Sequence, residues 1–407
     1  MSSNMNILVI SHMYPSSQKP VNGVFVHEQV KAIVKKGHNV RVISPIPYVP
    51  FFLDKISMKW KKYKLTKPQE IVEGIPVYYP TYIAIPRNLN FQTSGVRMYS
   101  GFKQVVEKIY KEFEFDLIHS HVALPDGYAA MMVAEKYAKP LVVTIHGQDF
   151  QQTIHKNNKC KNAIEKVLQA ADKTTLVSGK LNRIRKNAFP VLQDDNFSVI
   201  NNGVSDFFIE ESVERKLKTE ITLLSVSNLI ETKGIDLNIK ALSKIVKHYP
   251  KIRYNIIGDG PQKPELVSLA KNLNLENNIF FLGTQSRQDV KKNMLEADVF
   301  ILPSWNEAFG VVYIEAMATG LPVIGCKGEG IEDIVEDGKE GYLIDPKNVS
   351  ELSEKILFLV SDLNIRQKLG ENARNKVKAS FTWSHKAMEL TELYNNIHEE
   401  KSLERDL

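Results

Sequence analysis

The stretch that decides the fold is "DVFILPSWNEAFGVVYIEAMATGLPVIGC", residues 298–326. It begins with an apolar run typical of a buried parallel strand, continues through a polar loop into an apolar helical segment, and ends in a second apolar run. Gly320 is expected to end the helix, and Pro322 lies just beyond it, before the next strand. The stretch is therefore a strand–helix–strand unit, which predicts a parallel sheet covered by helices.

The same alternation of apolar runs and helical patterns continues along the whole chain of 407 residues. A chain of this length exceeds one ordinary hydrophobic core, so two domains are expected. The apolar runs form two series, at residues 6–11, 40–44, 116–120, 141–146, 174–178 and 197–200, and at residues 221–227, 253–258, 279–283, 298–303 and 322–326. Two series of strand–helix–strand units predict an α/β protein with two doubly wound, Rossmann-like domains.

A charged segment at residues 210–220 separates the two series and is the expected link between the domains. We expect the first domain at residues 1–205 and the second at residues 206–380. The amphipathic pattern from residue 381 to residue 400 predicts one long helix within a final segment, residues 381–407. Ligands of doubly wound domains bind at the carboxyl ends of strands, so the loops after strands are the expected place for the site.

The composition is that of a soluble globular protein, with 43% hydrophobic and 25% charged residues. No apolar run approaches the ~20 residues that a membrane-spanning helix needs, and the N-terminus does not have the pattern of a signal peptide. The two cysteines, Cys160 and Cys326, lie far apart in the sequence and form no metal-ligand pattern. These features favour a protein of the reducing cytoplasm.

The net charge of +6 is distributed unevenly. Residues 1–205 contain 27 Lys and Arg against 15 Asp and Glu, a balance of +12, whereas the remainder is acidic. Within the basic half, residues 55–67 combine six lysines with Trp60 and Tyr63. A solvated basic loop is one interpretation, but lysines can also face anionic lipid headgroups while aromatic rings enter the interface. We favour docking on an anionic membrane surface and hence a lipid-linked substrate.

Two carboxylates in the opening stretch, Glu307 and Glu315, raise the question of function. Glu307 lies in the loop at the carboxyl end of a strand, and the helix is expected to begin near Phe309-Gly310. Free backbone amides at this helix start and the helix dipole favour a phosphate group. Glu315 lies too deep in the helix to meet that phosphate but can accept hydrogen bonds from a ribose diol. The spacing favours a bound nucleoside diphosphate over a hydrolase acid/base pair, and a Glu pair on a solvated helix is the alternative.

A second candidate for anion binding is Lys233, which precedes Gly234 at the start of an amphipathic pattern. A lysine at such a helix start can act as a point charge for phosphate, although most lysines in this setting are simply solvated. The Gly-rich turn at residues 256–266 lacks the G-x-G-x-x-G spacing of dinucleotide-binding folds, and no Walker motif is present. An oxidoreductase is therefore not favoured.

Together, "EAFGVVYIE" (307–315), "EAMATGLPVI" (315–324) and "TKGID" (232–236) resemble motifs of the retaining glycosyltransferases of family four, group 1. The resemblance covers nearly the whole chain and implies the GT-B fold, in which two Rossmann-like domains face a central cleft. It implies that the first domain binds the acceptor, that the second binds the nucleotide sugar, and that the C-terminal helix returns to the first domain. It also implies transfer without a metal or other cofactor.

The resemblance assigns roles to residues of the second domain. Glu315 is expected to bind the ribose hydroxyls and Lys233 the diphosphate, while Glu307 holds hydroxyls of the donor sugar. The remaining donor-binding candidates lie at the helix start and in the loop after residue 226: Asn228, Ala308, Phe309, Gly310 and Val311. Asn228 departs from the family, which usually has Gly-Arg-Leu where this chain has Ser227-Asn228-Leu229. Because Asn228 carries no charge, the leaving group must depend more on Lys233 and backbone amides.

The resemblance also assigns roles in the first domain. Gly23, at the entry of the helix predicted over residues 23–37, resembles the loop that closes over the diphosphate. His146 and Asp149 lie in "VTIHGQDF", and the histidine of this motif faces the donor sugar near its reacting carbon. A strand-end histidine bonded to backbone is the alternative for His146. His119 and His121 in "HSHVALPDGYAA" are expected to line the acceptor cleft, and we place His121 and Asp149 among the acceptor-binding residues.

We therefore expect a hexosyltransferase that moves a sugar from a nucleoside diphosphate to a hydroxyl of a surface-polysaccharide or lipid-linked glycan, with His146, Glu307 and Lys233 as its catalytic residues. The "SNL" variant resembles a subgroup associated with teichuronic-acid and related surface-polysaccharide synthesis. A cytoplasmic enzyme, at the inner face of the membrane, fits this expectation, and nucleic acid is not an expected partner. A nucleotide-sugar 2-epimerase and a non-catalytic sugar-nucleotide-binding protein are the alternatives.

Overall fold

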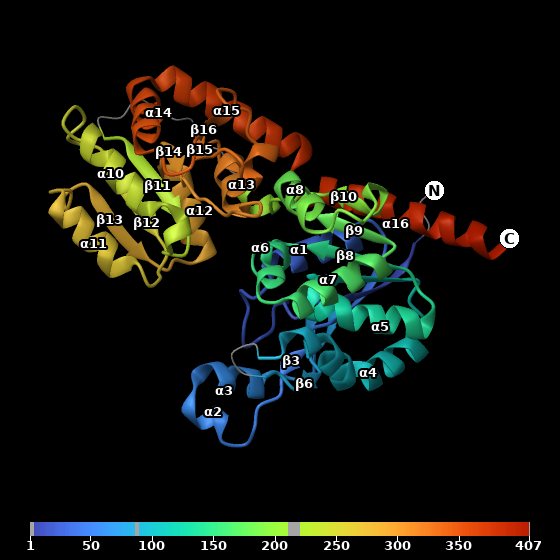
Figure 1. The fold of residues 1–407 in the computed structure, drawn as a ribbon. Helices are drawn as coiled ribbons and strands as arrows, with labels where there is room; N and C mark the ends of the chain where they lie inside the picture. Colours follow the sequence, from blue (N-terminus) through green and yellow to red (C-terminus); the bar gives the residue numbers. More distant parts are fainter. Residues whose placement is uncertain (1–3, 86–88, 211–219, 407) are drawn as a thin grey trace. The chain divides into compact units, whose positions relative to one another are not determined.

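A computed structural model describes residues 4–85, 89–210 and 220–406 (Figure 1). The chain divides into two compact units. Unit 1 comprises Met1–Asn202 together with Trp383–Leu407, and unit 2 comprises Gly203–Thr382. The sequence places the domain boundaries at residues 205 and 380, and most of the predicted link at 210–220 lies outside the described residues.

Unit 1 contains an eight-stranded sheet in the order β10-β9-β8-β7-β1-β2-β5-β4. All pairs in this sheet are parallel except β4 with β5, which form an antiparallel hairpin at one edge. Its strands are β1 (Asn6–Ile10), β2 (Asn39–Ile43), β4 (Gln69–Val72), β5 (Ile75–Tyr78), β7 (Leu117–His121), β8 (Leu141–Ile145), β9 (Lys173–Leu176) and β10 (Phe197–Val199). Two further short strands, β3 (Ile46–Pro47) and β6 (Thr81–Tyr82), pair with each other.

Helices cover both faces of this sheet. Ile7 and Val9 of β1 join a buried cluster with Val30 of α1 and Leu390 of α16. Since alternate residues of a strand point to opposite faces, the equally buried Leu8 lies under the helices of the other face. The main helices of the unit are α1 (Val24–Lys35), α4 (Ser94–Glu112), α5 (Tyr128–Tyr137), α7 (Asn158–Ala170), α8 (Gly179–Ala188) and α16 (Trp383–Asp406).

The basic stretch at residues 55–67 forms two short helices, α2 (Leu53–Ile56) and α3 (Met58–Leu65), where one interpretation of the sequence was a loop. No residue of either helix is buried. Within the described parts of the chain, no helix has both the length and the apolar character needed to cross a membrane.

The C-terminal helix α16 is a structural part of unit 1. Tyr394 is fully buried, and its hydroxyl hydrogen-bonds to His119 Nδ1 at 2.7 Å. Thr391 Oγ1 lies 3.2 Å from Nε2 of the buried His38. These contacts fasten the C-terminal helix to β7 and to the residue that precedes β2.

Tyr394→Ala is expected to lower the free energy of unfolding by about 3–5 kcal/mol, because it removes a buried aromatic ring and leaves a cavity. Tyr394→Phe keeps the ring, removes only the hydroxyl, and is expected to cost about 1–2 kcal/mol. Urea unfolding followed by circular dichroism measures both. Equal stability of the two variants would show that packing of the ring does not hold α16 in place.

Unit 2 contains a six-stranded sheet, entirely parallel, in the order β13-β12-β11-β14-β15-β16. Its strands are β11 (Thr222–Val226), β12 (Arg253–Ile257), β13 (Ile279–Gly283), β14 (Val299–Ile301), β15 (Val323–Cys326) and β16 (Gly341–Ile344). Its main helices are α10 (Ile235–Ile245), α11 (Lys263–Asn272), α12 (Arg287–Glu296), α13 (Val311–Ala318), α14 (Val349–Ser361) and α15 (Leu363–Ser380). The prediction of two doubly wound α/β domains is confirmed.

Candidate functional site

A pocket of about 400 Å³ opens in unit 2 at the carboxyl ends of its strands. The sheet runs outward in one direction from β11 to β13 and in the other from β14 to β16, so the switch in strand order lies between β11 and β14. The pocket lies at this switch and receives residues from the loops after both strands. This is the position at which open α/β sheets bind their ligands.

The helix start at Gly310 forms one wall of the pocket, with Val311 and Val312. Gly310 has φ +84°, and a Cβ there would lie 2.6 Å from the ring of Tyr313. Tyr313 is buried and donates its hydroxyl hydrogen to the Leu302 carbonyl, which fixes α13 against β14. The first amides of a helix have no intrahelical acceptor, so this wall offers hydrogen-bond donors and the positive end of a helix dipole.

Lys233 and Glu307 line the pocket together and form an ion pair between Nζ and Oε2. Lys233 ends a short turn before Gly234, which takes up φ +66° and leads into α10. Ser304 Oγ lies 3.3 Å from the same Glu307 oxygen. The Glu307 amide donates to the Glu329 carboxylate at 2.6 Å. The structure therefore brings together two of the three predicted catalytic residues from segments far apart in the sequence.

Glu315 lies one turn after Val311 on the same face of α13, because residues four apart in a helix share a face. The side chain is half-buried and is not itself part of the pocket wall. Burial raises the pKa of Glu315 to about 7, although the Arg287 guanidinium works in the opposite direction. Near neutral pH this carboxyl group is poised between its protonated and ionised forms.

The other predicted donor-binding residues take different positions. Asn228 is exposed and lines the pocket, as do Gly310 and Val311. Phe309 is buried, and neither it nor Ala308 belongs to the pocket wall. A contact of Ala308 or Phe309 with a ligand in this pocket stays a prediction.

Sequence reasoning gave no role to Ser227 or Gly258, which also line the pocket. Ser227 Oγ is buried and has no hydrogen-bond partner among the described residues. Gly258 has φ +131°, and a Cβ there would lie only 1.8 Å from the Ser227 carbonyl oxygen, so glycine is required. The Gly-rich turn after the strand that ends at residue 257 is the sequence feature from which this close contact could have been predicted.

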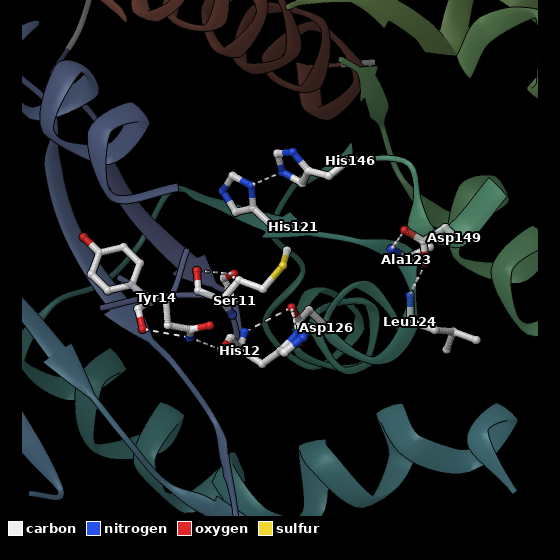
Figure 2. A network of polar contacts seen from close by, with 11 residues as sticks. Ser11, His12, Tyr14, His121, Ala123, Leu124, Asp126, His146 and Asp149 are labelled. Carbon is white, nitrogen blue, oxygen red and sulfur yellow. Dashed lines mark hydrogen bonds and ion pairs between the residues drawn. The ribbon is translucent and has the colours of Figure 1, made fainter. Parts of the chain in front are cut away.

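In unit 1, three histidine rings stack at the carboxyl ends of β7 and β8, and Figure 2 shows two of them, His121 and His146. His119 and His121 are stacked at 4.7 Å, His121 and His146 at 5.2 Å. His121 Nδ1 lies 2.9 Å from His146 Nε2, so one ring donates a hydrogen and the other accepts it. Burial lowers the pKa of His119 and His146 to about 3, and that of His121 falls well below its usual value. All three rings are therefore neutral at physiological pH.

His146, the predicted catalytic histidine, does not bond to backbone in the way the alternative interpretation supposed. Its Nδ1 is buried and has no partner among the described residues, and its ring lies 4.8 Å from that of Phe25. His121 is fully buried, so the predicted acceptor contact would need its side chain to become accessible.

Asp149 is buried and holds a turn together (Figure 2). Its two carboxylate oxygens accept hydrogen bonds from the amides of Ala123 at 3.0 Å and Leu124 at 3.2 Å. Burial raises the pKa of Asp149 to about 6. These contacts position the segment after β7, and an acceptor contact of Asp149 stays a prediction.

An ion pair in unit 1 between the half-buried His12 and the buried Asp126 was missed by sequence reasoning. His12 follows β1, and its Nδ1 lies 2.8 Å from Asp126 Oδ2, which also accepts the His12 amide hydrogen (Figure 2). Burial disfavours the imidazolium, but the Asp126 carboxylate and, to a smaller extent, that of Asp149 together raise the pKa of His12. Gly23 lies nearby with φ +63° at the start of α1, and a Cβ there would lie 2.2 Å from the Met13 carbonyl oxygen.

No group of three or more His, Cys, Asp or Glu side chains in the described parts of the chain is arranged to hold a metal ion. Independence from metal stays a prediction of the family resemblance.

Comparison with known proteins identifies the family. Residues 23–206 match the model of Glycosyltransferase Family 4, and residues 206–376 match that of Glycosyl transferases group 1. A curated relative of Bacillus subtilis (strain 168), TuaC, named as a teichuronic acid biosynthesis glycosyltransferase, is 29% identical over 97% of this chain and 99% of its own length.

Two solved structures share the fold. Sucrose-phosphate synthase of Thermosynechococcus elongatus superimposes with a TM-score of 0.77 at 20% identity, covering 97% of this chain and 99% of that one. HepE of Anabaena, solved in complex with UDP and glucose, gives a TM-score of 0.70 at 21% identity, covering 97% of this chain and 100% of that one. The α/β units of this chain are thus those of the GT-B fold.

The two family models together cover both units, and the relative aligns from end to end. These matches are to glycosyltransferases and give no support to the epimerase alternative. The chain belongs to the group 1 glycosyltransferases of family 4.

Proposed function

We propose that the protein is a retaining hexosyltransferase whose donor is a nucleoside-diphosphate sugar and whose acceptor is a hydroxyl of a surface-polysaccharide or lipid-linked glycan. The observation that carries the proposal is the unit 2 pocket. One cation, Lys233, and the open helix start at Gly310 line this pocket, and the Glu315 carboxyl lies one turn further along α13. Lys233 and the helix start match a diphosphate, and Glu315 matches the hydroxyls of a ribose. Glu307 matches the hydroxyls of a sugar.

In the reaction, the bond between the sugar C1 and the diphosphate oxygen breaks, and a bond from C1 to the acceptor oxygen forms. The diphosphate leaves with the electron pair of the broken bond, and the proton of the acceptor hydroxyl is released with it, so that atoms and charge balance. Lys233 and the first amides of α13 would stabilise the charge that develops on the diphosphate. Retention would give the product the same anomeric configuration as the donor.

The ion pair between Lys233 and Glu307 suggests how the donor is received. A diphosphate near Lys233 would compete with Glu307 for the ammonium group, because both are anions. Glu307 would then be available to accept hydrogen bonds from the sugar hydroxyls. A neutral His146 can also hydrogen-bond to the sugar but cannot act as a proton donor of imidazolium type near pH 7.

The test is incubation with radiolabelled UDP-, GDP- and dTDP-sugars without acceptor. A transferase is expected to hydrolyse its own donor slowly to free sugar and nucleotide, and NMR of the released sugar should show the donor's anomeric configuration first. An epimerised donor would point to an epimerase, and binding without any turnover would point to a non-catalytic binding protein. An inverted anomer would contradict the retaining mechanism.

We further propose that unit 1 docks on an anionic membrane through the α2–α3 surface, defined as residues 51–67. Large apolar side chains are solvent-exposed there: Phe51 is 80%, Phe52 60% and Ile56 74% exposed. Lysines surround them at positions 55, 59, 61, 62, 64 and 67. Apolar side chains that enter the interface and lysines that meet anionic headgroups act together in such docking. Such docking would hold the enzyme at the cytoplasmic face of the cell membrane, next to a lipid-linked acceptor.

Replacing Phe51 and Phe52 together by serine is expected to weaken binding to anionic vesicles at least about tenfold, because two rings no longer enter the interface. Sedimentation with phosphatidylglycerol-containing and with purely zwitterionic vesicles measures the partition. Val191→Ser is the matched control, since Val191 is 75% exposed elsewhere in unit 1. Equal partition of the wild type into both kinds of vesicle would end the membrane proposal.

A further inference from the structure

A second pocket lies in unit 1, on the edge of the sheet where the strands end. It measures about 100 Å³ and is formed by residues that follow β1, β2 and β5, together with side chains from β3, β6 and α3. The switch in strand order of this sheet lies between β7 and β1, next to the first of these strands. The position is therefore one where an α/β sheet binds ligands.

The wall of this pocket is polar but contains no carboxylate. Its polar members are His12, Tyr14, Ser16, Lys19, Asn22, Ser44, Tyr63, Thr66, Tyr79 and Tyr82. Several of them already have partners within the protein: the Tyr14 hydroxyl bonds to His27 Nδ1 at 2.8 Å, and the Tyr79 hydroxyl donates to the Pro15 carbonyl. The His12 charge is balanced by the buried Asp126.

Lys19 is the member whose charge is not balanced. Its Nζ lies 3.1 Å from the centre of the Tyr63 ring and forms no ion pair with a described residue. The carboxylate of Glu70, in the adjacent hairpin, is held by the amide and hydroxyl of Ser17 at 2.9 and 2.6 Å. An ammonium group in a pocket whose lining has no carboxylate can bind an anion.

Groups around Lys19 also disfavour its positive charge. Burial, and then the positive charges of Lys59 and Lys62 on α3, lower the pKa of Lys19 to about 8. The group is still mostly protonated at pH 7, and a bound anion would relieve the repulsion among the three lysines. The pocket has room for several water molecules. It can therefore take up an oxyanion group.

We propose that this pocket binds an oxyanion carried by the acceptor, either a carboxylate or a phosphate, with Lys19 as the counter-charge and the Tyr63 ring beside it. The inference rests on the proposed function, because it assigns the oxyanion to the acceptor substrate. It makes the enzyme selective for acceptors that bear a negative charge. It also gives α3 a second role, since the helix that presents lysines outward supplies one wall of the pocket.

The experiment measures binding of three small probes by isothermal titration calorimetry: inorganic phosphate, glucuronate and the neutral sugar glucose. Titrations are run on the full chain with saturating nucleoside diphosphate, so that the unit 2 pocket is already filled. The variants are Lys19→Gln, Lys19→Arg, and the matched control Lys108→Gln, an exposed lysine on α4 of the same unit. Thermal unfolding of each variant confirms that it is folded.

We expect glucuronate or phosphate to bind wild type and Lys108→Gln alike, and Lys19→Gln at least about tenfold more weakly. Lys19→Arg, which keeps the positive charge, should recover much of the binding. Binding of phosphate alone would assign a phosphate-bearing acceptor, and binding of glucuronate alone a carboxylate-bearing one. The proposal is overturned if neither anion binds wild type, if glucose binds as tightly as the anions, or if Lys19→Gln binds like wild type.

Failure of the unit 1 pocket proposal can be distinguished from failure of the proposed donor site in unit 2. If the proposed function fails but the pocket is an anion site, Lys19→Gln will still lose the probes while Lys233→Gln leaves nucleotide binding unchanged. If the pocket inference fails alone, Lys233→Gln will weaken nucleotide binding and Lys19→Gln will have no effect on either ligand.

Discussion

Replacing Lys233 by glutamine is expected to lower kcat/KM for sugar transfer by about 10²- to 10³-fold, with little change in stability. Lys233 is the one cationic side chain among the described residues that line the unit 2 pocket. Asn228, which also lines the pocket, carries no charge, so no guanidinium from that position shares the charge of the leaving diphosphate. Loss of one preorganised group that stabilises developing negative charge typically has an effect of this size.

The measurement is initial-rate kinetics with the donor found in the sugar-nucleotide incubations. Lys244→Gln, an exposed lysine on α10, provides the same change of charge away from the pocket. Because glutamine also leaves Glu307 without its ion-pair partner, thermal unfolding of the variant should be compared with that of the wild type. Wild-type kcat/KM in Lys233→Gln would exclude this residue from leaving-group stabilisation.

Replacing Glu315 by glutamine is expected to weaken binding of the nucleoside diphosphate about ten- to a hundredfold at pH 8. A carboxylate that accepts hydrogen bonds from two ribose hydroxyls loses charge-assisted bonds when it becomes a neutral amide. The helix should remain intact, since Glu315 is only half-buried and no hydrogen bond of its side chain to another described residue is seen.

The affinity for the nucleoside diphosphate is expected to increase with pH, for the following reason. In the free protein the pKa of Glu315 is about 7. Hydrogen bonds from ribose favour the ionised form and lower that pKa in the complex. Affinity should therefore increase as the pH rises from about 5.5 towards 7, and level off above about 8.

Terminal phosphate groups titrate near pH ~6 as well, so the quantity to report is the difference between wild type and Glu315→Gln over this pH range. Calorimetric titration with the nucleoside diphosphate gives both curves. A wild-type curve that runs parallel to that of Glu315→Gln would mean that this carboxyl group does not meet the ribose.

The strand–helix–strand pattern made the architecture of both units predictable. Strands such as β1 and β14 are short apolar runs buried on both faces, and such runs are visible in the sequence. Lys233 and Glu307 could be expected in one pocket because each follows a strand, and β11 and β14 are neighbours in the sheet. The β4–β5 hairpin was not predicted, since half-exposed edge strands carry a weaker apolar signal.

Contacts that depend on packing between distant segments could not be predicted. Asp149 has the same local sequence whether its carboxylate faces a ligand or the amides of Ala123 and Leu124, and only the fold decides between the two. The stacking of His119, His121 and His146 likewise depends on the register between β7 and β8. The basic stretch at 55–67 has no amphipathic periodicity, so its helices could not be separated from a charged loop.

The central claim is that a nucleoside diphosphate binds in unit 2 between Lys233 and the start of α13. A crystal structure of the protein with the nucleoside diphosphate of its donor tests this claim most directly. The account predicts density for the diphosphate against the amides at the Gly310–Val312 turn and beside Lys233 Nζ, with both ribose hydroxyls within hydrogen-bonding distance of Glu315. A nucleotide bound elsewhere, with Lys233 still paired to Glu307, would contradict it.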